Sequence, residues 1–136
     1  MSRSGYYDGG DDYWAIIRWR GAVRSALRGR RGQAFLREML AAMDALPQPR
    51  LIVGELVNEA GECCAIGSIA LSRGVDVSEL DPEEREHVAS VFGIARAMTQ
   101  EIAYLNDEAG SCKETPEERF ARMRRWVESK LEGERD

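Results

Sequence analysis

The sequence predicts an α+β fold that is predominantly α: a compact single domain of five or six helices with one small β-hairpin. Two observations predict the helices. Apolar residues recur at spacings of three and four over long stretches, and Pro82 and Pro116 each follow a capping residue. A third observation predicts the hairpin, because residues 51–57 are short, apolar and β-branched.

The 136 residues have the length and composition of one folded domain. No apolar run approaches the ~20 residues that a membrane span needs, and the chain start lacks the apolar core of a signal peptide. Three cysteines, an odd number, favour a reducing compartment, so we expect a cytoplasmic protein. We expect a flexible N-terminal arm over residues 1–11, a single globular domain over 12–132 and a frayed tail over 133–136.

Residues 12–46 predict two helices around Gly29-Arg30-Arg31-Gly32. The first is capped by Asp11 or Asp12, and its apolar face comprises Ile16, Trp19, Val23, Ala26 and Leu27. The second runs from about Gln33 to Leu46 and ends before Pro47 and Pro49. Its predicted buried side chains are Phe35 or Leu36, Met39, Leu40 and Met43.

Residues 51–66 allow two interpretations. We favour a hairpin in which 51–57 and 62–66 are strands joined by the turn Asn58-Glu59-Ala60-Gly61. The alternative is a helix, because Ile52, Val53, Leu56, Val57 and Ala60 also fit one helical face. Residues 68–73 then form one or two helical turns that end at Gly74.

Three helices are predicted in the rest of the chain. Asp81 and Thr115 are the expected caps of the first and last, and Gly93 separates the first from a helix over residues 94–105. The predicted buried side chains are Val88, Val91 and Phe92, then Ala95, Met98, Ile102 and Leu105, then Phe120, Met123, Trp126 or Val127, and Leu131.

The charge distribution is uneven along the chain. Residues 1–50 contain nine arginines and five acidic residues, whereas residues 51–136 contain ten basic and nineteen acidic residues. Residues 18–37 hold seven arginines and no acid, and a helical stripe recurs at Arg20, Arg24, Arg28 and Arg31. Acidic helices of the same domain would neutralise this stripe, or acidic helices of a second copy would do so in a homodimer. Alternatively, the stripe binds a partner protein or nucleic acid.

Each functional interpretation uses a different set of residues. In a nucleic-acid-binding protein, the stripe arginines would bind phosphate, and Tyr13, Trp14 or Trp19 would stack on bases. The two helices would then resemble a helix-turn-helix. The net charge of −5 speaks against a dedicated nucleic-acid binder. An acidic partner patch that mimics phosphate charge would comprise Glu83, Glu84, Glu86, Glu117 and Glu118.

No catalytic constellation, cofactor motif or metal site is predicted. His87, the single histidine, lies among charged residues and is expected to be solvated. Cys63, Cys64 and Cys112 lack the spacing of zinc ligands, and we interpret them as packing residues. Asp107 is the carboxylate of most interest, for which a helix cap or a pair with Arg119 is favoured.

Several motifs resemble small uncharacterised proteins of bacteria and their phages. They are Cys64-Ala65-Ile66-Gly67, Asn106-Asp107, Thr115-Pro116-Glu117 with Arg119 and Trp126, and in some cases Arg18-Trp19-Arg20-Gly21 and Arg31-Gly32-Gln33-Ala34-Phe35. The resemblance implies a phage or prophage accessory protein and no particular activity. Such proteins often bind and disable a host complex, including CRISPR complexes. We therefore expect a non-enzymatic inhibitor that binds a host protein or ribonucleoprotein complex, with a nucleic-acid-binding regulator as the alternative.

Overall fold

The computed structural model describes residues 3–4 and 13–132, and this part of the chain contains six helices. They are α1 (Tyr13–Arg28), α2 (Arg30–Asp44), α3 (Ala65–Arg73), α4 (Arg85–Phe92), α5 (Arg96–Asp107) and α6 (Pro116–Lys130). The predominantly helical prediction is confirmed. None of these helices has both the length and the apolar composition to cross a membrane.

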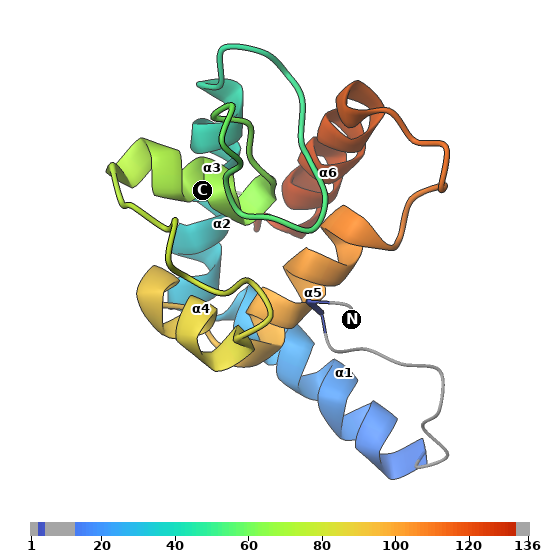
Figure 1. Cartoon of the computed structure of the whole chain (residues 1–136). Helices are drawn as coiled ribbons and strands as arrows, with labels where there is room; N and C mark the ends of the chain where they lie inside the picture. The colour runs from blue at the N-terminus through green and yellow to red at the C-terminus, as the bar shows by residue number, and fades with distance from the viewer. Residues whose placement is uncertain (1–2, 5–12, 133–136) are drawn as a thin grey trace.

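Helices α2 and α5 organise the packing. Helix α2 passes through the middle of the molecule and contacts α1, α3 and α6, while α5 contacts α1, α3, α4 and α6 (Figure 1). The start of α1 projects away from the body (Figure 1). The fully buried side chains at the centre include Leu36, Met39, Met43, Ile66, Ile69, Met98, Ile102, Met123 and Val127.

The two helices predicted for residues 12–46 are confirmed, with one changed boundary. Gly29 is the N-terminal cap of α2, so Arg30 and Arg31 belong to the first turn of α2. A Cβ atom on Gly32 would lie 1.8 Å from the Ala26 carbonyl oxygen, so the tight α1–α2 corner requires glycine there. Ile16, predicted to be buried, is 40% exposed because the start of α1 extends beyond the core. The predicted caps Asp11 and Asp12 lie outside the described residues.

The predicted β-hairpin is wrong, and the alternative helix over residues 52–60 is also absent. Within the described residues, the only β-pairing is an isolated antiparallel bridge between Val57 and Cys63. The second half of the expected hairpin instead enters α3, where the Cys64 side chain accepts a hydrogen bond from the Gly67 amide. A Cβ atom on Gly67 would lie 1.8 Å from the Leu56 carbonyl oxygen, so glycine lets the loop lie against α3.

The later helices follow the predictions with three corrections. The helix expected over residues 94–105 runs over Arg96–Asp107, and Ala95, predicted to be buried, is its half-buried N-terminal cap. Helix α4 begins at Arg85, because Asp81 caps a turn by accepting from the Glu83 amide instead of starting the helix. Val91 is 37% exposed, whereas its neighbour Ala89 is buried. The break at Gly93 is confirmed by its left-handed φ of 72°. At α6, the predicted capping box of Thr115 and Glu118 is present on both sides.

Candidate binding face and polar junctions

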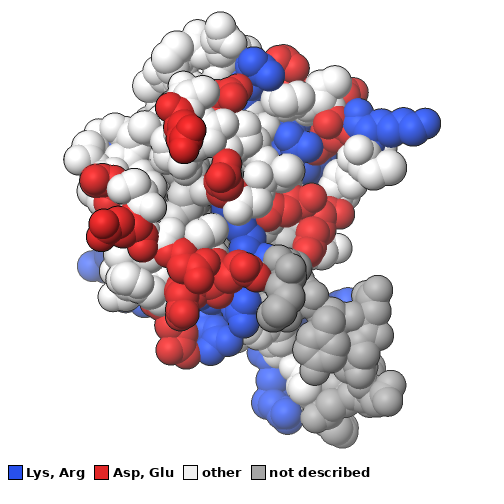
Figure 2. Space-filling model, viewed as in Figure 1, with Lys and Arg blue, Asp and Glu red and all other residues white. Residues whose placement is uncertain are grey.

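The four predicted stripe arginines are all exposed, but they lie on two helices. Arg20, Arg24 and Arg28 recur every four residues on α1, and Arg31 lies in the first turn of α2. We call these four residues the arginine face. Basic side chains are visible along α1 in the lower part of Figure 2.

No acidic partner within the described residues pairs with the arginine face. Arginines elsewhere behave differently: Arg73 pairs with Glu38 at 2.7 Å, Arg96 with Glu86 at 2.7 Å and Arg124 with Asp44 at 2.8 Å. The domain therefore neutralises many of its arginines but leaves this face positively charged. The hypothesis that acidic helices of the same domain satisfy the stripe finds no support among the described contacts.

Two features beside the arginine face favour the close approach of an anionic ligand. Gly21 is exposed on α1, and a Cβ atom there would meet nothing within 4 Å, so the described fold does not require glycine. Gly21 shares a side of the helix with Arg24 and Arg28, which follow at positions i+3 and i+7. At the start of α2, no side chain caps the helix and the first turn holds no acid. Free amides and the positive end of the helix dipole at this point favour an anion.

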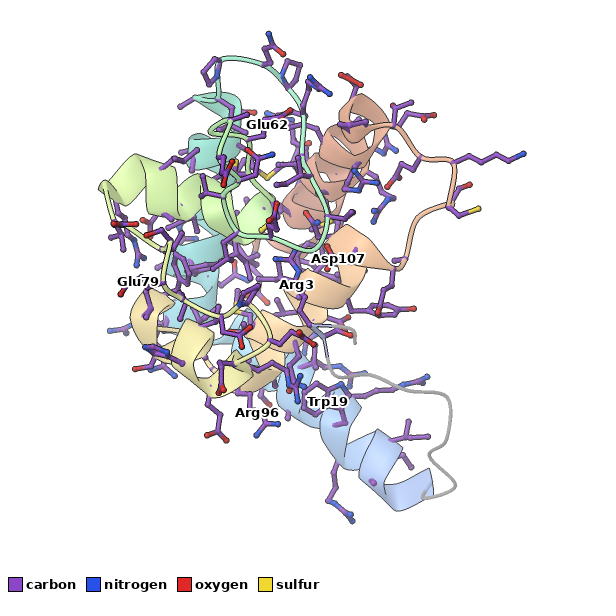
Figure 3. The ribbon with its side chains drawn as sticks, viewed as in Figure 1. Arg3, Trp19, Glu62, Glu79, Arg96 and Asp107 are labelled. Atoms are coloured by element: carbon purple, nitrogen blue, oxygen red, sulfur yellow. The ribbon has the colours of Figure 1, made fainter. Side chains whose placement is uncertain are left out.

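The predicted acidic patch is split between two places. Glu83, Glu84 and Glu86 lie at or near α4, whereas Glu117 and Glu118 begin α6 at the opposite side of the molecule (Figure 1). Glu86 pairs with Arg96, and Glu117 pairs with Arg50 at 2.9 Å. Acidic side chains gather instead over the α3–α4 loop and α4, where Glu79 also lies (Figures 2 and 3). A single patch of these five residues is therefore not formed.

The Asn106-Asp107 motif ties three segments together. The Asn106 side chain, 1% exposed, accepts from the Ala65 amide at 3.1 Å and donates to the Ile52 carbonyl at 2.9 Å. Asp107 pairs with Arg3 rather than with the predicted Arg119, and it also accepts from the Gly54 amide at 3.2 Å. The end of α5 thus holds the loop before α3 and the N-terminal segment (Figure 3).

A second junction joins α5 to α6. Glu114 accepts two hydrogen bonds from Arg122, at 2.7 and 2.9 Å, and its side chain is 9% exposed. Arg122 also donates to the carbonyl of Leu105 at 2.6 Å, and Arg119 donates to that of Leu51 at 2.9 Å. The Arg122 guanidinium lowers the pKa of Glu114 below its ordinary value, against the opposing effect of burial. Arg119, which belongs to the resembling motifs, therefore has a structural contact in this junction.

The single histidine and the three cysteines lie in different surroundings. His87 is exposed, as predicted, and Cys63 and Cys64 are buried while Cys112 is exposed. Burial raises the pKa of Cys63 to about 12, so its thiol is a poor nucleophile. A pocket of about 440 Å³ beside Cys63 is lined by Leu46, Pro47, Gln48, Arg50, Ala60, Gly61, Glu62 and Cys63. No group of three or more potential metal ligands occurs among the described residues.

The chain matches no protein-family model, no curated protein and no solved structure.

Two residues of the expected flexible arm, Arg3 and Ser4, contact the end of α5 beside the Asn106-Asp107 motif. Arg3 is 5% exposed and Ser4 is 1% exposed, while the rest of residues 1–11 lies outside the described part. A short Gly-, Ser- and Asp-rich segment carries no periodic signal that would reveal such a contact. Of the predicted stacking residues, Trp19 is half-buried where α1 meets the body (Figure 3), and the side chains of Tyr13 and Trp14 lie outside the described residues.

Proposed function

We propose that this protein acts by stoichiometric binding, docking its arginine face on an anionic surface of a protein or ribonucleoprotein complex. The observation that supports this proposal is that Arg20, Arg24, Arg28 and Arg31 are exposed without an acidic partner in the described domain. The chain as a whole has a net charge of −5, so unpaired arginines are not explained by a shortage of acids. An acidic surface on a partner would supply the missing counter-charges.

The resemblance to phage and prophage proteins suggests where that partner would be found. It motivates the further proposal that the complex belongs to a bacterial host and that binding inhibits a defence system, as an anti-CRISPR protein does. The exposed glycine of α1 supports a docking role, since a helix-interior glycine costs about 1 kcal/mol relative to alanine. A partner that approaches closely at Gly21 would account for that cost.

A nucleic-acid-binding regulator is the second candidate, favoured by the uncapped start of α2 beside the arginines. Helix N-termini bind phosphate through free amides and the helix dipole, and arginine binds phosphate bidentately. Helix α2 is buried on one side at Phe35, Met39 and Met43. Its exposed arginines Arg30, Arg31 and Arg37 would therefore face a nucleic acid, and arginine binds phosphate. Binding would therefore contact the backbone, and its affinity would fall steeply with salt.

The experiment is capture of partners from a bacterial lysate by the tagged full-length protein, with and without nuclease, followed by mass spectrometry and a nucleic-acid stain. The test variant is Arg24→Glu/Arg28→Glu. The matched control is Arg125→Glu/Lys130→Glu, which makes the same charge change at exposed positions of α6. Both variants are first shown to be folded by circular dichroism.

A near-equimolar protein partner that survives nuclease, is lost with Arg24→Glu/Arg28→Glu and is kept by the control would support the first proposal. Nucleic acid alone, lost with the same variant, would replace it with the second. On duplex DNA the logarithm of affinity should then fall by about 0.9 per phosphate neutralised for each tenfold rise in salt. Capture that is equal for both variants, or turnover of a substrate by far less than equimolar protein, would overturn the proposal.

A further inference from the structure

The start of α4 carries acidic side chains that are as exposed as the arginine face. Glu83, Glu84 and Glu86 all lie at the surface, and among the described contacts only Glu86 has an ion pair, with Arg96 at 2.7 Å. We call these three glutamates the acidic face. Residues 76–86 contain six acids and one base, so the region around the acidic face is strongly negative (Figure 2).

The arginine face has a positive charge of similar size. Residues 13–31 contain six arginines and no acid, and Arg20, Arg24 and Arg28 follow one another at intervals of four on α1. Helices α1 and α4 both contact α5, yet no ion pair that the structure describes joins the arginine face to the acidic face. One chain therefore carries two exposed surfaces of opposite charge that are not paired with each other.

Each of the two surfaces also has an exposed apolar side chain. Ile17 is 42% exposed and precedes Arg20 and Arg24 by three and seven residues, so these three residues share a side of α1. On α4, Val91 is 37% exposed and follows Glu84 by seven residues, which places both on one side of that helix. A phosphate group offers Ile17 no apolar contact, whereas an acidic helix with an exposed valine does.

We propose that a second copy of this chain covers the arginine face, in a two-fold dimer in which α1 of each copy packs against α4 of the other. Acidic side chains over α4 and basic side chains along α1 are visible on the same side of the molecule, so one two-fold axis brings both pairs together (Figure 2). The dimer occupies the surface that a partner would use, so a partner has to displace the second copy. This competition rests on the proposed function, whereas the dimer itself does not.

The proposed contact is small and depends mainly on charge. Helix α4 has eight residues, which limits each contact to about 12 Å of helix. Contacts of this length are typical of transient interfaces, at the low end of the size range near 1,200 Å². Salt reduces the attraction, because the Debye length falls from about 30 Å at 0.01 M to about 8 Å at 0.15 M. We therefore expect a dimer at high protein concentration and low salt, and monomers at about 0.5 M salt.

The test is a charge swap in the full-length protein, followed by sedimentation velocity at about 20 mM salt, where screening is weak. One variant is Arg24→Glu/Arg28→Glu, and the other is Glu83→Arg/Glu84→Arg. Each variant alone should associate at least about tenfold more weakly than the unsubstituted protein, because its two faces then have the same sign. An equimolar mixture of the two variants should form the dimer again, since each copy offers the charge that the other needs.

The matched control is Glu55→Arg/Glu59→Arg, which makes the same charge change at exposed loop positions and should dimerise like the unsubstituted protein. All variants are first shown to be folded by circular dichroism. A mixture of the two face variants that stays monomeric would overturn the proposal. An unsubstituted protein that is monomeric at about 0.5 mM and low salt would overturn it as well.

The dimer and the proposed function can fail separately. Glu83→Arg/Glu84→Arg removes the dimer but leaves the arginine face unchanged, so this variant should still capture the partner from a lysate. A protein that passes the charge swap but captures no partner would keep the dimer and lose the proposed function. Capture that depends on Arg24 and Arg28 in a protein that fails the charge swap would do the reverse.

Discussion

Three arginines of α6 and three arginines of α1 have opposite surroundings. Arg119, Arg122 and Arg124 each lie within 3.5 Å of a carboxylate of their own domain. Arg20, Arg24 and Arg28 are exposed and pair with no acid that the structure describes. One residue type therefore fastens elements together in one region and leaves a charged surface in the other. If this comparison is right, substitutions in the first region change stability, and substitutions in the second change binding.

The largest effect is expected at Arg122. The change Arg122→Ala removes two hydrogen bonds to Glu114 and one to the Leu105 carbonyl. It leaves the largely buried Glu114 carboxylate without its main partner. We expect the free energy of unfolding to fall by about 2–3 kcal/mol, below the full cost of breaking a buried pair because Arg122 is partly exposed. Urea unfolding followed by circular dichroism measures it.

The counterpart change is Arg24→Ala, which removes an exposed arginine of similar helical context from α1. Its expected effect on the free energy of unfolding is within about 0.5 kcal/mol, as for surface sites without specific contacts. Similar losses at both positions would show that Arg24 has a stabilising partner and would abolish the difference between the two regions.

The second prediction concerns pH. Contact with Arg122 lowers the pKa of Glu114 in the folded chain below its ordinary value near 4.5, so folding is favoured more at pH values above 4.5 than below. We expect Glu114→Gln to reduce the free energy of unfolding by about 1–2 kcal/mol at pH 7. The difference from the unsubstituted protein should shrink as pH falls through the folded-state pKa, because the carboxyl is then protonated in both states. Melting temperatures between pH 3 and pH 7 check this.

The control for the pH prediction is Glu59→Gln, at an exposed loop position without an ion pair among the described contacts. Its melting curve should shift by less than that of Glu114→Gln at every pH. A pH-independent difference for Glu114→Gln would show that shape or hydrogen bonding, and not the carboxylate charge, stabilises the α5–α6 junction.

Local signals in the sequence predicted the helices but not the contacts between distant segments. The capping box at Thr115 and the helix break at Gly93 depend on neighbouring residues, and both are confirmed. The two halves of the expected hairpin exchange only a few backbone hydrogen bonds, and other backbone groups that a regular ladder would use have distant partners. The Ile52 carbonyl accepts from Asn106, and the Leu51 carbonyl accepts from Arg119. Nothing near residues 51–57 in the sequence reveals these side chains.

The candidate sites show the same division. The stripe at Arg20, Arg24 and Arg28 follows from helical spacing, and its exposure agrees with that pattern. Whether acids elsewhere neutralise a stripe depends on the packing of all six helices, so spacing alone left both outcomes open. The Arg3–Asp107 pair joins residues 104 positions apart, whereas the sequence favoured a helix cap or a pair with Arg119 for Asp107.

The smallest effect is the most specific test of the arginine face. Gly21→Ala adds one methyl group where the described fold has nothing within 4 Å, so it should raise the free energy of unfolding by about 0.5–1 kcal/mol through helix propensity. If a partner approaches this side of α1 closely, the same methyl group should weaken binding, and Gly21→Gln should weaken it further. Differential scanning calorimetry and titration against the captured partner measure the two quantities.

The control for Gly21 is Ala121→Gln, which adds bulk at an exposed position of α6 and should leave binding unchanged. A Gly21→Ala variant that is more stable but binds the partner more weakly is not explained by damage to the fold, because a damaged fold would lower both stability and affinity. A stabilised Gly21→Ala variant with unchanged affinity would place the contact elsewhere on the arginine face. Glycine would then lower the stability of α1 without serving the binding role that separates α1 from α6.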